Sequence, residues 1–496
     1  MASIINHWIN GELQPSTTER YGDVFNPATG EVSASVSMGN SDDLNKAVES
    51  ASKAFEAWSQ TSVTKRAQIF FKYKELLETN REELIELITK EHGKVASDAA
   101  GSLQRGIEVV DFVCGIPHLL KGEFSEQVGT GIDCYSTRQP IGVCSGVTPF
   151  NFPAMVPMWM FPIAIACGNT FILKPSEKDP SCAMKLAELL QEAGLPKGVL
   201  NVVNGDKEVV DAILEHSSIK TFSFVGSTPV AQYVHEKASA NGKRVQALGG
   251  AKNHAIVLED ASLEQTSNAI IGAAYGSAGE RCMAISVVVA VEGVADELCK
   301  LLSEKAAALK IGPGNEAENE MGPLITNEHK NKVIDYIQQG IESGATILLD
   351  GREHDVTNKP GFFLGPTLFD DVSPEMSIYK EEIFGPVLVV LRVKDFNAAI
   401  RLANEHQFGN GVAIFTNQGS KAREFVHSVE VGMVGINVAI PVPLSFYTFG
   451  GWKDSIFGSS NIYGMDGIRF FTRTKTVTAR WVEGDGSINL SMPTIK

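Results

Sequence analysis

A cysteine beside an arginine is the first feature of this 496-residue chain with the chemistry of a reactive site. Cys282 follows Arg281 in the segment GERCMA at residues 279–284. A thiolate attacks carbonyl carbon well, and a neighbouring cation favours the ionised thiol. The segment falls where a glycine-interrupted helix is expected to end and the apolar run Ile285–Val291 begins. Cys282 is therefore the candidate nucleophile, against the alternative of a buried structural thiol.

Short β-rich runs alternate with helical patterns from residue 143 onward, which predicts a parallel sheet. Such alternation is typical of an open, doubly wound α/β sheet, whose ligands bind at the carboxyl ends of the strands. Asn151, Lys174 and the pair Gly226-Ser227 each follow a predicted strand closely, so we expect them to converge on one edge. The chain has no Gly-x-Gly-x-x-Gly sequence. The predicted strands are 143–147, 170–173, 199–203 and 221–225, and the helices between them 154–166, 182–193, 207–216 and 229–240.

A second α/β pattern begins near residue 251 and continues to about residue 440. It opens with a predicted strand at 253–258, and Ser262 with Gln265 forms a predicted capping box for the next helix. The first 120 residues are predicted to be mostly helical, with amphipathic helices at 42–60 and 65–92. Short β-like pieces stand outside both patterns, at 132–139 and 475–482.

Composition and charge narrow the class of protein. With 43% hydrophobic and 21% charged residues the chain is typical of globular proteins, and its length favours two or three domains. A net charge of −16 argues against nucleic acid or an anionic membrane as a general partner. Seven cysteines without a Cys-x-x-Cys pair suggest neither a disulfide scaffold nor a metal site.

The apolar run 154–168 is too short to span a membrane and is interpreted as a buried helix. No signal peptide is evident, so a soluble cytoplasmic protein is expected.

Five separated segments resemble signatures of the aldehyde dehydrogenase family, in the family's order. The resemblance covers essentially the whole chain. It implies a Rossmann-type NAD-binding domain (1–131 and 140–250), an α/β catalytic domain (251–445), and a small β oligomerisation element with the C-terminal tail (132–139 and 446–496). In that family the small β element pairs with a neighbouring subunit, so a homo-oligomer, either dimer or tetramer, is expected. The five segments are TPFNFP at 148–153, KPSE at 174–177, FVGST at 224–228, EEIFGP at 381–386 and FGGWK at 449–453.

The resemblance also implies roles for individual residues. Cys282 would form a thiohemiacetal with an aldehyde. Asn151, whose alternative role is to cap a helix, would join the Cys282 N–H in stabilising the oxyanion. Lys174 and Glu177 would bind the adenosine ribose, with a surface ion pair as the alternative. A carboxylate at this position favours NAD over NADP. The further cofactor-binding candidates are Phe150, Lys178, Gly226, Ser227, Glu382 and Phe384.

Ala247 departs from the family pattern. Hydrolytic aldehyde dehydrogenases carry a Glu-Leu-Gly-Gly-Lys segment whose glutamate activates water, whereas residues 246–252 of this chain read QALGGAK. A methyl group cannot accept a proton, but coenzyme A (CoA) is a thiol and attacks thioesters without that base. In this replacement, in GER before the cysteine and in AKNH at 251–254, the chain resembles the CoA-acylating methylmalonate-semialdehyde dehydrogenases. It implies oxidative decarboxylation of malonate or methylmalonate semialdehyde to acetyl-CoA or propionyl-CoA, with CoA as co-substrate.

Two arginines are candidates for binding the carboxylate of such a substrate. Arg281 adjoins the nucleophile, and Arg105 continues the apolar stripe of a predicted helix. A buried arginine requires an anionic partner. The alternative for Arg105 is an internal pair with Glu108 or Asp111, or contact with solvent.

Three other functions remain open. A hydrolytic aldehyde dehydrogenase would use another base, such as Glu280 or Glu382, and would need no CoA. A non-enzymatic protein that keeps the fold would form no NADH. A cysteine acyl-hydrolase would need a histidine base, and none of the ten histidines has a recognisable partner motif around Cys282.

Overall fold

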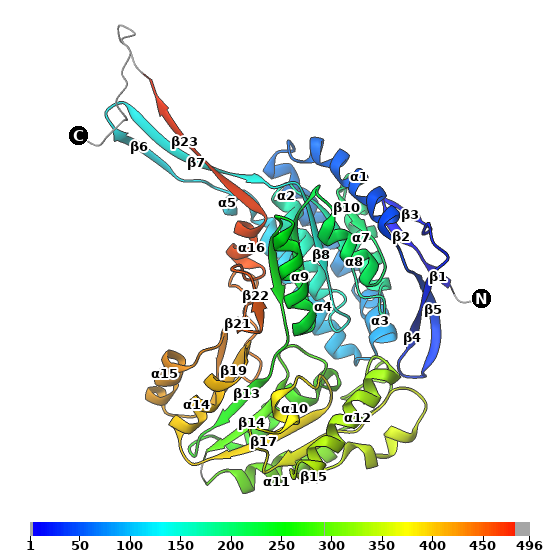
Figure 1. Ribbon diagram of the computed structural model, residues 1–496, viewed down its shortest axis with the longest axis vertical. Helices are drawn as coiled ribbons and strands as arrows, with labels where there is room; N and C mark the ends of the chain where they lie inside the picture. Colours follow the sequence, from blue (N-terminus) through cyan, green and yellow to red (C-terminus); the bar gives the residue numbers. More distant parts are fainter. Residues whose placement is uncertain (1–2, 292, 482–496) are drawn as a thin grey trace.

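Two large sheets, each covered by helices, make up the body of the protein, and a narrow three-stranded sheet projects from it (Figure 1). This arrangement comes from a computed structural model that describes residues 3–291 and 293–481. It confirms the predicted α/β fold with a small additional β element.

The larger sheet has eight strands in the order β22-β12-β11-β8-β9-β10-β2-β3. Its five central strands are parallel, whereas the strands added at both ends are antiparallel. The strands are β2 (His7–Ile9), β3 (Glu12–Gln14), β8 (Val143–Val147), β9 (Thr170–Lys174), β10 (Leu200–Val202), β11 (Ile219–Val225), β12 (Arg244–Leu248) and β22 (Ile456–Phe457). The helices of this half are α1 (Ser41–Trp58), α2 (Val63–Thr79), α3 (Arg81–His92), α4 (Ala96–Cys114), α5 (Ile116–Leu119), α6 (Met155–Ala166), α7 (Ser181–Glu192), α8 (Lys207–Glu215), α9 (Thr228–Ala240) and α16 (Gly464–Phe470).

The second sheet has seven strands in the order β15-β16-β17-β14-β13-β19-β20, parallel except for β15. The strands are β13 (Asn253–Val257), β14 (Ile285–Val291), β15 (Thr346–Leu349), β16 (Thr367–Asp370), β17 (Val387–Val393), β19 (Gly411–Phe415) and β20 (Met433–Ile436). Its helices are α10 (Leu263–Tyr275), α11 (Ala295–Ala307), α12 (Asn327–Glu342), α13 (Ser377–Lys380), α14 (Phe396–Glu405) and α15 (Gly419–Ser428), with 3₁₀ turns η1 (Gly276–Gly279), η2 (Gly351–Glu353) and η3 (Asp355–Asn358).

Three small sheets complete the structure. The projecting sheet has the order β23-β7-β6, and β23 pairs antiparallel with the whole of β7. The strands of the small sheets are β1 (Ser3–Ile5), β4 (Tyr21–Asn26), β5 (Glu31–Ser37), β6 (Phe124–Gly129), β7 (Ile132–Pro140), β18 (Phe408–Gly409), β21 (Trp452–Lys453) and β23 (Thr472–Arg480).

The predicted strands and helices of the two large sheets are confirmed, apart from shifts of a few residues at their ends. The single helix predicted at 65–92 is wrong, because Asn80 separates α2 from α3. The predicted capping box is also wrong, since Ser262 is the N-cap of α10 but its side chain makes no capping bond. β23 begins at Thr472, before the predicted start, and Val482 lies outside the described residues.

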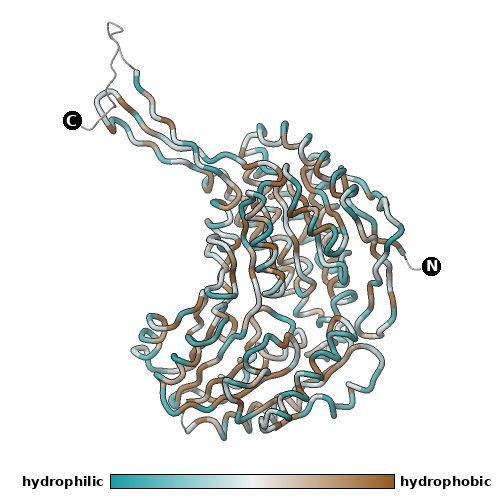
Figure 2. The backbone as a smooth tube through the Cα atoms, in the orientation of Figure 1, coloured by the Kyte–Doolittle hydropathy of each residue, from teal (hydrophilic) through white to brown (hydrophobic). Residues whose placement is uncertain are grey.

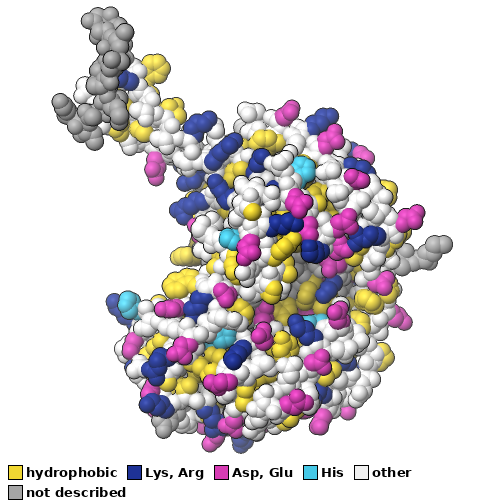
Figure 3. Space-filling model, in the orientation of Figure 1, with side chains coloured by type: hydrophobic (Ala, Val, Ile, Leu, Met, Phe, Trp, Pro, Cys, Tyr) yellow, Lys and Arg dark blue, Asp and Glu magenta, His cyan; other side chains and the backbone are white. Residues whose placement is uncertain are grey.

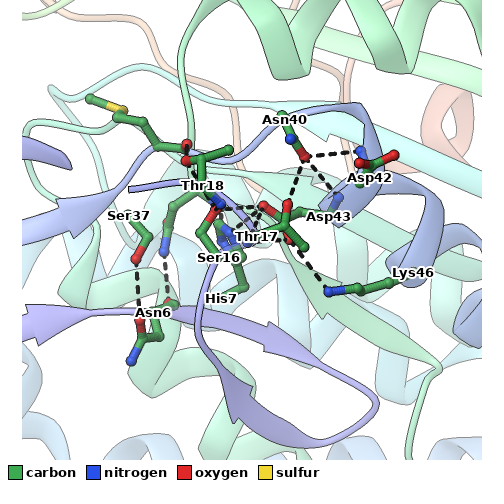
Figure 4. Close-up of polar contacts among 12 residues, drawn as sticks. Asn6, His7, Ser16, Thr17, Thr18, Ser37, Asn40, Asp42, Asp43 and Lys46 are labelled. Atoms are coloured by element: carbon green, nitrogen blue, oxygen red, sulfur yellow. Dashed lines mark hydrogen bonds and ion pairs between the residues drawn. The ribbon is translucent and has the colours of Figure 1, made fainter. Parts of the chain in front are cut away.

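Five strands precede α1 and are absent from the sequence prediction, because three of them are only three residues long and show no periodicity. A buried polar cluster attaches this region to α1 (Figure 4). One ring nitrogen of His7 accepts a hydrogen bond from the Asn204 N–H, and the other lies 3.4 Å from Asp43. Asp43 also accepts hydrogen bonds from the Thr17 N–H and the Ser16 hydroxyl.

Hydrophobic residues concentrate in the central strands of both large sheets (Figure 2). The apolar run 154–168 is confirmed as a buried helix, α6, every residue of which is shielded from solvent. On the face drawn in Figure 3, acidic and basic side chains are interspersed. Within the described ranges, no helix is both long and apolar enough to cross a membrane. The same residues contain no cluster of three His, Cys, Asp or Glu side chains that could hold a metal ion.

Candidate active site

Cys282 follows a left-handed turn that leads from α10 towards β14. Ser277, Ala278 and Gly279 have φ values of 55°, 50° and 75°, in a region that L-residues rarely adopt. A Cβ on Gly279 would lie 2.2 Å from the carbonyl oxygen of Gly385, so only glycine fits there. Backbone strain of this kind persists only where the surrounding structure holds it, and it clusters at functional sites.

The surroundings of Cys282 disfavour its thiolate. Burial raises the pKa of the thiol to about 12, and the charge of Glu382 acts in the same direction. The backbone N–H groups of Cys282 and Met283 and the ammonium of Lys94 lower the pKa without offsetting burial. Cys282, Glu382 and Phe384 line one narrow cavity, together with Arg281. The thiol therefore requires further stabilisation before it can act as a nucleophile.

Asn151 lies in the same site and is buried. Its Nδ2 donates a hydrogen bond to the backbone carbonyl of Glu280 at 3.1 Å, two residues before Cys282. The ammonium of Lys94 donates to the carbonyl oxygen of Asn151 at 2.6 Å. The N-cap of α6 is Ala154 and has no side-chain capping bond, so the helix-capping alternative for Asn151 is wrong. The Asn151 amide is instead held against the nucleophile segment.

A buried ionisable cluster behind Cys282 is absent from the sequence prediction, apart from Glu280 itself. The Glu280 carboxylate lies 3.9 Å from His92 and 3.7 Å from His329. Burial raises the pKa of Glu280 to about 8 and lowers the pKa values of both histidines. At neutral pH, Glu280 is therefore mostly protonated and the histidines are neutral. The sequence feature that could have indicated this cluster is the charged segment EHGK at 91–94, which lies at the end of an amphipathic helix.

Two candidate cofactor contacts lie at the carboxyl edge of the larger sheet. The ammonium of Lys174, at the end of β9, lies 2.9 Å from Glu177 Oε2; the ion pair considered from the sequence is present, although Lys174 is buried and not on the surface. Ser227 follows Gly226 at the end of β11 and is the N-cap residue of α9. The N-terminus of a helix presents N–H groups and a positive dipole end, which suit a phosphate. Because β9 and β11 both adjoin β8, these residues share one edge, as predicted.

The other cofactor candidates surround the opening near Cys282. The ammonium of Lys178 lies 5.1 Å from the centre of the Phe150 ring, and the Phe384 ring lies 5.9 Å from the same ring. Glu382 accepts a hydrogen bond from the Ala251 N–H at 2.9 Å. Burial raises the pKa of Glu382 to about 7. Glu382 and Phe384 therefore lie in the cavity of Cys282, and Phe150 with Lys178 lies on the other side of Phe384.

Arg105 is internally paired. Its guanidinium lies 2.8 Å from Glu108, which is the alternative considered from the sequence, and it donates to the backbone carbonyls of residues 442–443. Arg105 and the buried Tyr463 line one small cavity, and both donate a hydrogen bond to the Pro443 carbonyl. Arg105 therefore lies beside Tyr463.

Arg281 is also paired, in different surroundings. It donates to Asp98 at 2.8 Å and to the backbone carbonyl of Gly272 at 3.3 Å. Its charge is therefore matched by a carboxylate, and adjacency in sequence does not by itself direct the guanidinium towards the Cys282 thiol.

Ala247 is fully buried in β12, opposite Phe224 of β11 and Phe457 of β22. The backbone position that carries a glutamate in the hydrolytic signature therefore carries a methyl group inside the core of the sheet. A general base must reach the proton that it removes, and this side chain offers none.

The family model for aldehyde dehydrogenases matches residues 13–477. With the fold and the site arrangement above, this match shows that the chain belongs to the aldehyde dehydrogenase family. The resemblance carried by the five sequence signatures is thereby confirmed.

Similar proteins within the family include malonate- and methylmalonate-semialdehyde dehydrogenases. The chain is 55% identical over 479 residues to malonate-semialdehyde dehydrogenase of Pseudomonas aeruginosa, with 96% of each chain covered. It is 52% identical to malonate-semialdehyde dehydrogenase 2 of Bacillus thuringiensis, covering 97% of this chain and 99% of the relative. The crystal structure of methylmalonate-semialdehyde dehydrogenase from Oceanimonas doudoroffii is 53% identical, with a TM-score of 0.96 over 98% of this chain and 99% of that one. A Sinorhizobium meliloti protein assigned to the same activity and complexed with NAD has the same identity, TM-score and coverage.

We predict that Cys282 of the free protein reacts slowly with iodoacetamide at neutral pH. Because its pKa is raised to about 12, the thiolate fraction and the alkylation rate should rise about tenfold per pH unit through the alkaline range. The rate is measured from the mass of the Cys282 peptide across a pH series. A plateau within about one unit of neutral pH would show an already activated thiol and contradict this prediction.

Proposed function

We propose that the protein catalyses NAD-dependent, CoA-acylating oxidation of malonate or methylmalonate semialdehyde, giving acetyl-CoA or propionyl-CoA, CO₂ and NADH. The observation that carries the proposal is Ala247, a buried methyl group at the position of the water-activating base, in a site that retains Cys282, Asn151 and Glu382. The names of relatives that are 50–55% identical support this substrate class.

The residues present fit a dinucleotide. The N-terminus of α9 offers N–H donors for the pyrophosphate, and Gly226 and Ser227 lead into it. Lys174 and Glu177 would bind the adenosine ribose, and Glu382 the nicotinamide ribose. Phe150, Lys178 and Phe384 would border the nicotinamide end. Bound NAD supplies the hydride acceptor. The carboxylate of Glu177 favours NAD over NADP because a 2′-phosphate there would meet like charge.

In this proposal Cys282 attacks the aldehyde carbon as a thiolate and forms a thiohemiacetal. The Nδ2 of Asn151 carries two hydrogens, and its bond to the Glu280 carbonyl orients the amide so that the second can meet the oxyanion. Loss of hydride from the adduct leaves a thioester on Cys282. The β-carboxylate of the acyl group departs as CO₂, and protonation of the resulting enolate gives an acetyl or propionyl thioester.

Transfer to CoA completes the cycle without a base at position 247. The CoA thiolate attacks the thioester carbonyl and releases the thiolate of Cys282. Water is a far weaker nucleophile at neutral pH and would need a proton acceptor, which Ala247 does not provide.

We assign Arg105 and Arg281 to the substrate carboxylate. Each is engaged with an internal carboxylate, Glu108 or Asp98, so substrate would compete with that pair. Arg281 lines the same cavity as Cys282, and Arg105 lines another cavity with Tyr463. A guanidinium can hold a carboxylate through two parallel hydrogen bonds.

A hydrolytic reaction is the second candidate, and the environment of Glu382 favours it. Its pKa, raised to about 7 by burial, suits a general base, and it lines the same cavity as Cys282. Glu280 also has a raised pKa, but its carboxylate is fully buried between two histidines. In this reaction the product would be a free acid and CoA would be unnecessary.

The assembly and domain division are proposals of the same kind. We propose a homo-oligomer, dimer or tetramer, in which the projecting sheet pairs with a second subunit. The domain boundaries follow the sequence prediction, with the tail beyond residue 481 outside the described residues. Cytoplasmic location stays a prediction.

We predict that NADH formation from malonate semialdehyde requires CoA and yields acetyl-CoA and CO₂. NADH absorbance is followed with and without CoA, and the acyl product is identified by mass. Cys282→Ala serves as the inactive control. Equal rates without CoA, with a free acid as product, would instead establish the hydrolytic reaction.

We predict that Arg105→Gln raises the KM for malonate semialdehyde about 10- to 100-fold while changing the KM for propanal much less, because only the former carries a carboxylate. Arg281→Gln should act in the same direction. Arg244→Gln is the matched control, since Arg244 also donates to backbone carbonyls but contacts residues 469–472. Equal changes in KM for both aldehydes would contradict the assignment.

A further inference from the structure

The carbonyl oxygen of Cys282 accepts two side-chain hydrogen bonds. Asn253 Nδ2 donates to it at 2.9 Å and Asn410 Nδ2 at 3.0 Å. Asn253 is the first residue of β13, and Asn410 directly precedes β19, the neighbour of β13 in the second sheet. Both side chains are buried, with 3% and 6% exposure. A carbonyl oxygen has two lone pairs, and these two amides occupy both.

Each amide is oriented by further contacts. Asn253 Oδ1 accepts a hydrogen bond from the Gly411 N–H at 3.0 Å, and its Nδ2 also donates to the Ala284 carbonyl at 2.9 Å. Asn410 Nδ2 also lies 3.0 Å from the sulfur of Met283. The four Nδ2 contacts therefore all fall on residues 282–284, the link between the left-handed turn and β14.

We infer that Asn253 and Asn410 are positioning residues for the nucleophile, which lock the Cys282 carbonyl and thereby orient the peptide that follows it. The inference rests on the proposed role of Cys282 as nucleophile. In a trans peptide the N–H points opposite to the C=O, so fixing the carbonyl also fixes the direction of the Met283 N–H.

Burial raises the pKa of the Cys282 thiol, and the Met283 N–H is one of the groups that lower it. Together with the Cys282 N–H, it lowers the pKa of Cys282, while the nearby Glu382 raises it. Hydrogen bonds accepted by a carbonyl polarise the same amide and strengthen its N–H as a donor. The two asparagines thus help the thiolate without adding a charge to the site. Greater mobility of the Cys282–Met283 peptide would weaken the stabilisation of the thiolate by the Met283 N–H.

The test is Asn410→Leu, which keeps the approximate size of the side chain and removes the donor. Alkylation of Cys282 by iodoacetamide, followed by peptide mass at one fixed alkaline pH, should slow about three- to tenfold, the loss expected for one hydrogen bond. The kcat for semialdehyde oxidation should fall by a similar factor, with the KM for NAD unchanged. Asn410→Ala is the second variant, for use if the leucine variant does not fold.

The matched control is Asn201→Leu. Asn201 is a fully buried asparagine whose Nδ2 donates to the Gly198 carbonyl at 2.8 Å, in the other large sheet. This substitution should destabilise the fold and leave the alkylation rate of Cys282 unchanged. A merely structural role for Asn410 would make the two variants alike.

Unchanged alkylation and kcat in a folded Asn410 variant would overturn the inference. This failure can be told from failure of the proposed function, because alkylation needs neither NAD nor aldehyde. If the wild-type protein oxidised no semialdehyde while Asn410→Leu still slowed alkylation, the inference about the thiol would stand and the proposed function would fail.

Discussion

In the proposed reaction, the half-buried thiol of Cys282 has to ionise in surroundings that disfavour its charge. Burial raises the pKa of Cys282 to about 12, and the charge of the Glu382 carboxylate raises it too. The adjacent Arg281 is matched by Asp98, so its cation is not free for the thiol. The thiolate is therefore stabilised by oriented backbone N–H groups more than by charged side chains. These N–H groups act only while the turn before Cys282 is held in its strained conformation.

Buried lysines supply much of that support. Lys94 donates to the carbonyl of Asn151, and Lys252 donates to the carbonyls of Ile378 and Glu381, next to Glu382. Burial lowers the pKa of Lys252 to about 7. Burying an ammonium group is costly unless it is hydrogen-bonded, so these contacts tie the loops of Asn151 and Glu382 to fixed points in the core. Asn151, the proposed oxyanion donor, and Glu382, the proposed ribose-binding carboxylate, are thus held in place through neighbouring backbone carbonyls.

The sequence predicts the parts of the fold that depend on local pattern. The alternation of strands and helices yields the parallel core of the larger sheet, and with it the shared edge of Lys174 and Ser227. Asn80 escapes prediction because the amphipathic pattern continues across it into the next helix. Contacts such as Lys94 with Asn151, or Asn410 with Cys282, join residues 57 and 128 positions apart, and no spacing rule encodes them. Arg281 shows the converse: a neighbour in sequence whose side chain is paired elsewhere.

The proposed reaction requires that Cys282 forms a thioester which water cannot efficiently release, because Ala247 supplies no base. This requirement can be examined by mixing the protein with NAD and malonate semialdehyde in the absence of CoA. We expect one burst of NADH, at most one per Cys282, followed by a stalled acyl group on the Cys282 peptide that CoA discharges. Continued turnover to a free acid, with no acylated peptide accumulating, would contradict it.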